Sequence, residues 1–140
     1  MENNEARWKQ RFQNFEKAFL FFESAVEKDS YTPIEVGGLV QAFEFTFELG
    51  WKTIKDFLYL QGLNTNYPRE VIKEGFQTHI IEDGHAWISM LEKRNELSHT
   101  YNQAVAEQAV EIIKHQYYPA VEQVYLFFKK KINEWQRFRV

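Results

Sequence analysis

Residues 33–60 read PIEVGGLVQAFEFTFELGWKTIKDFLYL, and this stretch decides the fold class. Its apolar residues recur at spacings of three and four, which predicts one apolar face along an α-helix. That face comprises Leu39, Phe43, Phe47, Gly50, Ile54 and Phe57, widened by Val40, Phe45, Trp51 and Leu58. Thr32 before Pro33 is typical of an N-cap followed by proline at the first helical position, and Gly62 is a typical stop. A helix this apolar must be central in the fold or covered by a second subunit.

The segments on either side show the same helical periodicity. Residues 5–28 carry an apolar stripe of Trp8, Phe12, Phe15, Phe19, Phe22 and Val26. Downstream, Pro68 begins a shorter helix and Asp83 caps the next one. A last helix spans residues 103–134, and Pro119 should kink that helix or split it in two. No two β-patterned runs face each other across a turn. We therefore expect an all-α, antiparallel up-and-down bundle of four main helices and a short one, forming a single domain over residues 1–140.

The composition narrows the possible functions. The formal net charge of −3 excludes a generally basic nucleic-acid binder, so any contact with RNA must be local. The chain has no cysteine, which removes disulfides and thiolate chemistry. Its polar, acidic start does not resemble a signal peptide, and no apolar run approaches the ~20 residues needed to cross a bilayer. We expect a cytoplasmic protein with no membrane partner. The chain has thirteen Phe, seven Tyr and four Trp, and aromatic residues beyond those that one small core uses often lie at an interface, which is consistent with a dimer.

The residues that carry chemistry cluster in the run KRNELSHTY, residues 93–101. Cleaving RNA without a metal requires a base for the 2′-hydroxyl proton, an acid for the leaving oxygen and a cation for the phosphate. His99 suits the proton transfers because the pKa of histidine lies near neutrality. Arg94 suits the phosphate because its planar guanidinium stays charged and matches phosphate oxygens.

The spacing of this cluster constrains how it can work. Arg94 and His99 lie five residues apart, about 140° around a continuous helix, whereas Asn95 and His99 share a face. Arg94 and His99 can therefore meet in one of two ways. Either the helix ends near Leu97 and the following chain turns His99 back toward Arg94, or the long side chain of Arg94 extends around the helix to His99. Each chain also supplies only one histidine here, so a symmetric dimer with facing motifs would provide both acid and base. From spacing alone, a polar helix end in which Asn95 and His99 bond the last turn is the simpler interpretation.

The same residues resemble HEPN-domain proteins of the HepT type. The HEPN pattern is Arg, four to six residues, then His, commonly with a polar residue after the Arg; here it runs from Arg94 through Asn95 to His99. The toxin branch adds a Tyr two residues after the His, which Tyr101 supplies. Further stretches resemble the family at residues 47–58, at Ile81-Glu82-Asp83 with Trp87 and Met90, and at Tyr118-Pro119-Ala120.

This resemblance implies a toxin of a toxin–antitoxin pair: a homodimeric endoribonuclease that needs no metal or other cofactor. Arg94 and His99 would be the catalytic pair at a cleft on the two-fold axis, with Asn95 in support. The partner would be a minimal nucleotidyltransferase that acts as antitoxin by transferring AMP from ATP to Tyr101. An adenylyl group two residues from His99 would block the cleft and repel RNA.

Other clusters point less clearly to chemistry. His79, Glu82, Asp83 and His85 match no usual metal-ligand spacing, and Asp83 is better used as a helix cap. Glu48 with Lys52 is interpreted as an i,i+4 ion pair, whereas Glu44 on the same helix stays a candidate cleft or interface residue. His115 is expected to be exposed. The basic C-terminal end, with Lys129, Lys130, Lys131, Arg137 and Arg139, is either a solvated surface or an RNA contact.

Two other functions remain open. The chain could be a non-catalytic subunit that presents a substrate to a separate nucleotidyltransferase, with a stable complex but no ribonuclease activity. It could also be a purely structural dimerisation module, which would leave the cluster of residues 94–101 without a role. The sequence carries no recognisable base-reading element, so it does not identify the RNA target.

Overall fold

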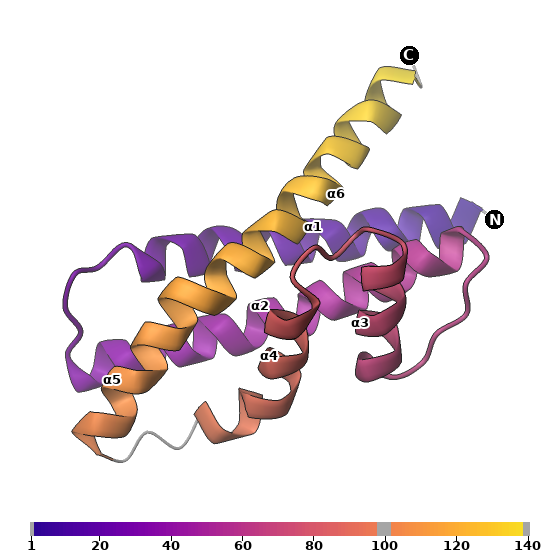
Figure 1. The fold of residues 1–140 in the computed structure, drawn as a ribbon. Helices are drawn as coiled ribbons and strands as arrows, with labels where there is room; N and C mark the ends of the chain where they lie inside the picture. Colours follow the sequence, from indigo (N-terminus) through magenta and orange to yellow (C-terminus); the bar gives the residue numbers. More distant parts are fainter. Residues whose placement is uncertain (1, 98–101, 139–140) are drawn as a thin grey trace.

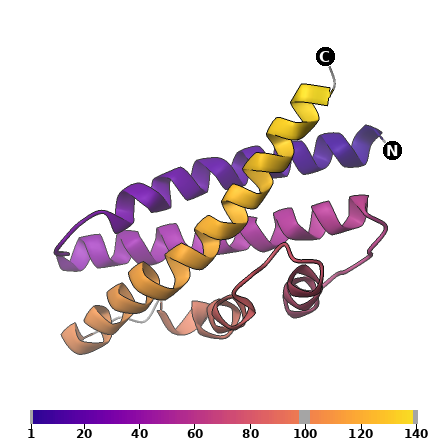
Figure 2. The same cartoon turned by 45° about the horizontal axis from the view of Figure 1, so that its top comes forward.

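The computed structural model describes residues 2–97 and 102–138, and over this part of the chain the protein is an all-α bundle, as predicted. The helices are α1 (Glu2–Val26), α2 (Pro33–Leu60), α3 (Pro68–Gln77), α4 (Gly84–Leu97), α5 (Gln103–Ile112), a π-helical turn η1 (Ile113–Tyr117) and α6 (Tyr118–Phe138). In Figure 1, α1 and α2 lie side by side and antiparallel, and the run from α5 to α6 crosses both. Figure 2 shows α3 and α4 on the side of α2 that faces away from α1.

The boundaries of α2 follow from local capping chemistry, as its sequence predicts. The Thr32 hydroxyl accepts a hydrogen bond from the Glu35 amide at 3.3 Å, and the Glu35 carboxylate accepts one from the Thr32 amide at 2.8 Å. This reciprocal capping box satisfies two amides at the helix start. At the other end Gly62 has φ +88°, a left-handed conformation that glycine adopts without strain. These two signals fix the longest helix of the bundle.

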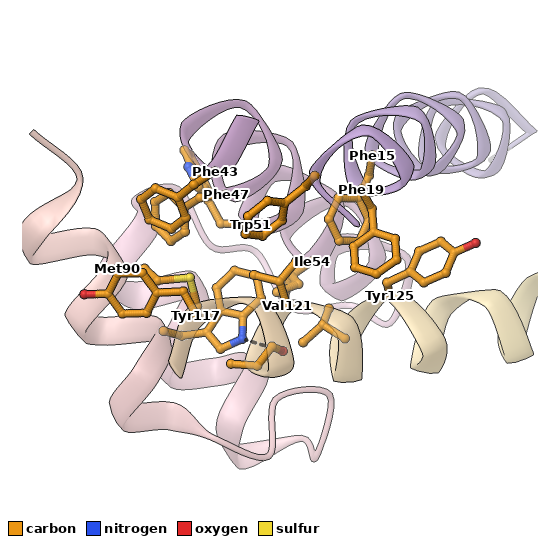
Figure 3. Close-up of a cluster of buried hydrophobic side chains, with 14 of the residues drawn as sticks. Phe15, Phe19, Phe43, Phe47, Trp51, Ile54, Met90, Tyr117, Val121 and Tyr125 are labelled. Carbon is orange, nitrogen blue, oxygen red and sulfur yellow. Dashed lines mark hydrogen bonds between the residues drawn. The ribbon is translucent and has the colours of Figure 1, made fainter. Parts of the chain in front are cut away.

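Aromatic rings contributed by α1, α2, α4 and the α5–α6 run form a large part of the core (Figure 3). Phe19 stacks on Tyr125 with ring centroids 4.3 Å apart, and Phe43 stacks on Tyr117 at 5.1 Å. Trp87 of α4 is fully buried, and its indole N–H donates to the Ala120 carbonyl at 3.3 Å. Rings of this size each bury a large apolar area, which favours folding.

One prediction about the core is wrong: Phe45 does not widen the buried face of α2. Its side chain is 58% exposed, whereas Phe43 and Phe47 on the same helix are fully buried. Phe45 projects from a side of α2 that no helix in the described part of the chain covers. Its sequence context could not show this, because the neighbours that decide burial come from distant segments.

Pro119 divides the last helical run, as predicted. The α5 helix ends at Ile112, and the π-helical turn η1 lies between it and α6, which contains Pro119. Proline has no N–H to donate to the carbonyl four residues before it, and its ring clashes with that carbonyl. A wider turn directly upstream relieves this conflict. The turn is tied to α4 through the Tyr117 hydroxyl, which lies 2.7 Å from the Ser89 hydroxyl.

Asp83 begins α4 as expected, because its carboxylate accepts a hydrogen bond from the Ala86 amide at 3.0 Å. It is therefore used as a cap.

Over residues 2–97 and 102–138, no three side chains of the metal-binding types are grouped to hold an ion. Within the same ranges, no helix has the length and apolar character that a bilayer span requires.

Candidate functional site

Two of the four predicted site residues, Arg94 and Asn95, lie in the last turn of α4. The other two, His99 and Tyr101, lie outside the described residues. Asn95 is exposed at the surface beside Arg94. The site can therefore be built from its α4 half and from the helix that α4 packs against.

Arg94 is anchored on α2. Its guanidinium Nη1 donates to the Glu48 carboxylate Oε1, and the guanidinium carbon lies 5.8 Å from the centre of the Phe47 ring. The second oxygen of Glu48 accepts the indole N–H of Trp51 at 3.0 Å. One carboxylate thus binds two donors from different elements, which fixes the direction in which the arginine points.

The predicted ion pair between Glu48 and Lys52 is wrong. Glu48 binds Arg94, and the Lys52 amine instead lies 5.9 Å from the centre of the Trp51 ring. A guanidinium held against an aromatic face offers a fixed planar donor set, whereas a lysine one turn away keeps a flexible, strongly hydrated charge. The tertiary contact therefore replaces the local one.

Glu44 lies one helical turn before Glu48 on the same face of α2. One of its carboxylate oxygens is buried and has no hydrogen-bond partner among the described residues. Burial, followed by the nearby charge of Glu48, raises the pKa of the Glu44 carboxyl. Burying a charged oxygen without a hydrogen-bond partner costs free energy. Glu44 therefore keeps its proton more readily than a carboxyl in water does. The structure places this candidate cleft residue beside the Arg94 anchor.

The site combines a partly exposed cation, Arg94, with the paired carboxylate of Glu48 and the partly buried carboxyl of Glu44. The Arg94 side chain is 30% exposed. A guanidinium has five N–H donors, enough to bind a phosphate oxygen as well as Glu48. The charge of Glu48 is offset by Arg94, whereas Glu44 has a raised pKa. Glu48 and Arg94 are 46 residues apart, and the only sequence signal for their meeting was the pair of acids, Glu44 and Glu48, among apolar residues in the middle of the helix.

The remaining candidates lie away from this site or serve the fold. His115 is exposed, with its imidazole 3.6 Å from Glu111. Lys129 of the basic C-terminal end binds Glu16 of α1 at 3.0 Å, so it is a structural ion pair. Lys131 lies 3.9 Å from Glu134, and Arg139 lies outside the described residues.

Comparisons with known proteins agree with this architecture. A family model described as nucleotidyltransferase substrate binding protein like matches residues 10–130. The chain is 33% identical over 76 residues to a probable ribonuclease HepT of Haemophilus influenzae, over 51% of this chain and 52% of that protein. It thus spans about half the length of the curated relative it matches. A crystal structure of a protein from Thermus thermophilus superposes with a TM-score of 0.72 at 27% identity, covering 79% of this chain and 94% of the other. The predicted HepT-type resemblance is thereby confirmed, and the chain belongs to the nucleotidyltransferase substrate binding protein like family.

Proposed function

We propose that this protein is a metal-independent endoribonuclease and the toxin of a toxin–antitoxin pair. The observation that carries the proposal is the arginine of the motif, Arg94, which Glu48 holds on α2 while its side chain stays 30% exposed. A catalytic cation must be held in place before the substrate arrives if it is to stabilise a developing phosphate charge. The similarity to a protein named probable ribonuclease HepT supports the same activity.

In the proposed reaction, His99 takes the proton of an RNA 2′-hydroxyl. The 2′-oxygen then attacks the adjacent phosphorus and the bond to the 5′-oxygen breaks, leaving a 2′,3′-cyclic phosphate. Arg94 stabilises the negative charge that develops on the phosphate oxygens, and Asn95 supports the motif. A second histidine, from the partner protomer, protonates the departing oxygen.

This mechanism requires a homodimer with the two motifs facing each other. Phe45 is 58% exposed on α2, one residue from Glu44 and three from Glu48. Ile34 is 88% exposed near the start of the same helix. A second copy that packs against this side would bury these apolar side chains and bring a second Arg94 to the same cleft.

The proposed partner is a minimal nucleotidyltransferase antitoxin that transfers AMP from ATP to the Tyr101 hydroxyl, with release of pyrophosphate. The test is the intact mass of the protein after incubation with ATP, Mg²⁺ and the transferase encoded beside it. We expect a gain of one AMP that is absent in Tyr101→Phe, and loss of RNA cleavage in the modified protein. An adduct that persists in Tyr101→Phe would refute the assigned tyrosine.

Catalysis itself is tested with His99→Ala. We expect loss of RNA cleavage and of growth arrest, with unchanged helical content by circular dichroism. A variant that cleaves RNA as well as the wild type would refute the assignment.

The description of the family supports a second candidate, a non-catalytic subunit that binds substrate for a nucleotidyltransferase. This alternative predicts a stable complex with the transferase, no AMP adduct and no ribonuclease activity in any variant. The mass and cleavage measurements above therefore separate the two.

A further inference from the structure

A second polar site lies at the end of the α1–α2 pair, away from the motif. The first turns of α1, the last turns of α2 and residues 64–66 of the following loop enclose a cavity of about 210 Å³. Its lining is mainly polar and includes Arg7, Lys55, Tyr59 and three asparagines.

The charge of this cavity is positive. Asp56 also lines it, but its carboxylate already accepts a hydrogen bond from Arg11 at 3.1 Å. Arg7 forms a longer ion pair with the same carboxylate, at 3.9 Å, and 65% of its side chain is exposed. Lys55 forms no ion pair within the described part of the chain. Lys55 and the exposed Arg7, which shares Asp56 with Arg11, are therefore the two cations that an anionic ligand would meet.

The cavity also holds an unsatisfied donor and an open aromatic ring. Thr65 is only 8% exposed, and its buried hydroxyl has no hydrogen-bond partner among residues 2–97 and 102–138. A buried hydroxyl without a partner costs free energy unless a ligand or water satisfies it. Tyr59 is 52% exposed, which leaves its ring available for stacking. Cations, a phenol ring and amide groups together suit a nucleotide.

The position of the cavity relates it to Arg94. Lys55 follows Glu48 by seven residues on α2, which brings it back to the same side of the helix about 10 Å further along. Arg94 is bound to Glu48 on that side. The Arg94 site and the cavity therefore open along one side of α2, close enough for one strand to contact both.

We propose that this cavity is a nucleotide-binding subsite for the RNA strand that is cleaved at Arg94. Arg7 and Lys55 bind a backbone phosphate, and a neighbouring base stacks on Tyr59. This inference rests on the proposed ribonuclease function and adds where the strand runs beyond the cleaved bond.

The test is binding of a 2′-O-methyl RNA of about eight nucleotides, a length within the range that single-strand grooves cover. The methyl groups block the attacking oxygen, so binding is measured without cleavage. The double variant Arg7→Gln/Lys55→Gln is compared with Lys17→Gln/Lys73→Gln, which removes the same charge elsewhere. We expect the slope of log affinity against log salt to fall by about 0.7 for each contact removed, only in the first variant. Tyr59→Leu should weaken binding about tenfold.

The outcomes separate this subsite from the proposed function. Equal affinity and salt slope in both double variants, with cleavage of ordinary RNA intact, would overturn the subsite alone. A wild-type protein that neither binds nor cleaves RNA would overturn both. AMP that competes with the RNA analogue as strongly as an oligonucleotide would overturn the RNA assignment and identify a free-nucleotide site.

Discussion

At the scale of single residues, Glu48 both positions the candidate site and links two helices of the fold. One of its carboxylate oxygens binds Arg94 of α4 and the other binds Trp51 of its own helix. The side chains of Arg94 and Glu48 are 30% and 38% exposed, so the pair contributes about 1 kcal/mol or less to stability. Its value lies in holding the guanidinium in one direction.

Glu48→Gln should therefore reduce cleavage far more than stability. The amide removes the charge that orients Arg94, and a small displacement of a catalytic group costs up to about a hundredfold in rate. The measurement is the rate of RNA cleavage alongside urea unfolding. Glu92→Gln is the matched control, because Glu92 is an exposed acid on α4 that pairs with Arg69. Equal cleavage rates in the two variants would exclude Glu48 as a positioning residue.

Glu44 predicts a pH dependence of stability. Its pKa is raised above the ordinary value of 4.5, so the folded state binds this proton more tightly than the unfolded state. The contribution of Glu44 to the free energy of unfolding is therefore fully present below pH 4.5, and it is lost as the pH rises through the raised pKa. Glu44→Gln should be more stable than the wild type at pH 7, with the difference vanishing near pH 4. Urea unfolding at both pH values checks this, and a variant that is less stable at pH 7 would contradict it.

At the scale of elements, α2 is closely packed at Gly50. A Cβ built at this position would lie 3.0 Å from Trp87 of α4 and 3.2 Å from Phe15 of α1. Glycine thus leaves room for side chains of α1 and α4 to meet against α2. Gly38 on the same helix has no atom within 4 Å of the corresponding position.

This contrast gives a matched pair of substitutions. Gly50→Ala should destabilise the protein by about 1–3 kcal/mol, because the rings that it meets are packed on all sides. Gly38→Ala should stabilise by up to about 1 kcal/mol, because alanine favours an open helical position. Chemical unfolding of both variants measures the difference. If both substitutions stabilise the protein, the contact between α1, α2 and α4 is not tight.

At the scale of the whole molecule, the proposed homodimer would form through the side of α2 that carries Phe45. Phe45→Glu should leave the monomer folded, because the residue is 58% exposed, while preventing dimers and with them RNA cleavage. Phe21→Glu is the control, since Phe21 is 62% exposed on α1. Analytical ultracentrifugation gives the mass of each variant. A Phe45→Glu protein that is still dimeric would show that the interface lies elsewhere.

Sequence alone determined the helices of this protein and most of their limits. Thr32, Pro33, Gly62 and Asp83 act within one turn of themselves, so their effect is readable from neighbours in the chain. The stripe of α1 was equally local, and its members from Trp8 to Phe22 are buried as predicted. The motif residues of 94–101 were also found from the sequence, as candidates for chemistry.

Only the tertiary structure decided what those elements touch. Glu48 meets Arg94 rather than Lys52, Phe45 faces outward, and Pro119 is accommodated by a π-helical turn. Each outcome depends on segments that are distant in sequence, or on how a long helical run absorbs a missing hydrogen bond. Periodicity assigns a residue to a face of its helix, but burial and pairing require knowing which other helix covers that face.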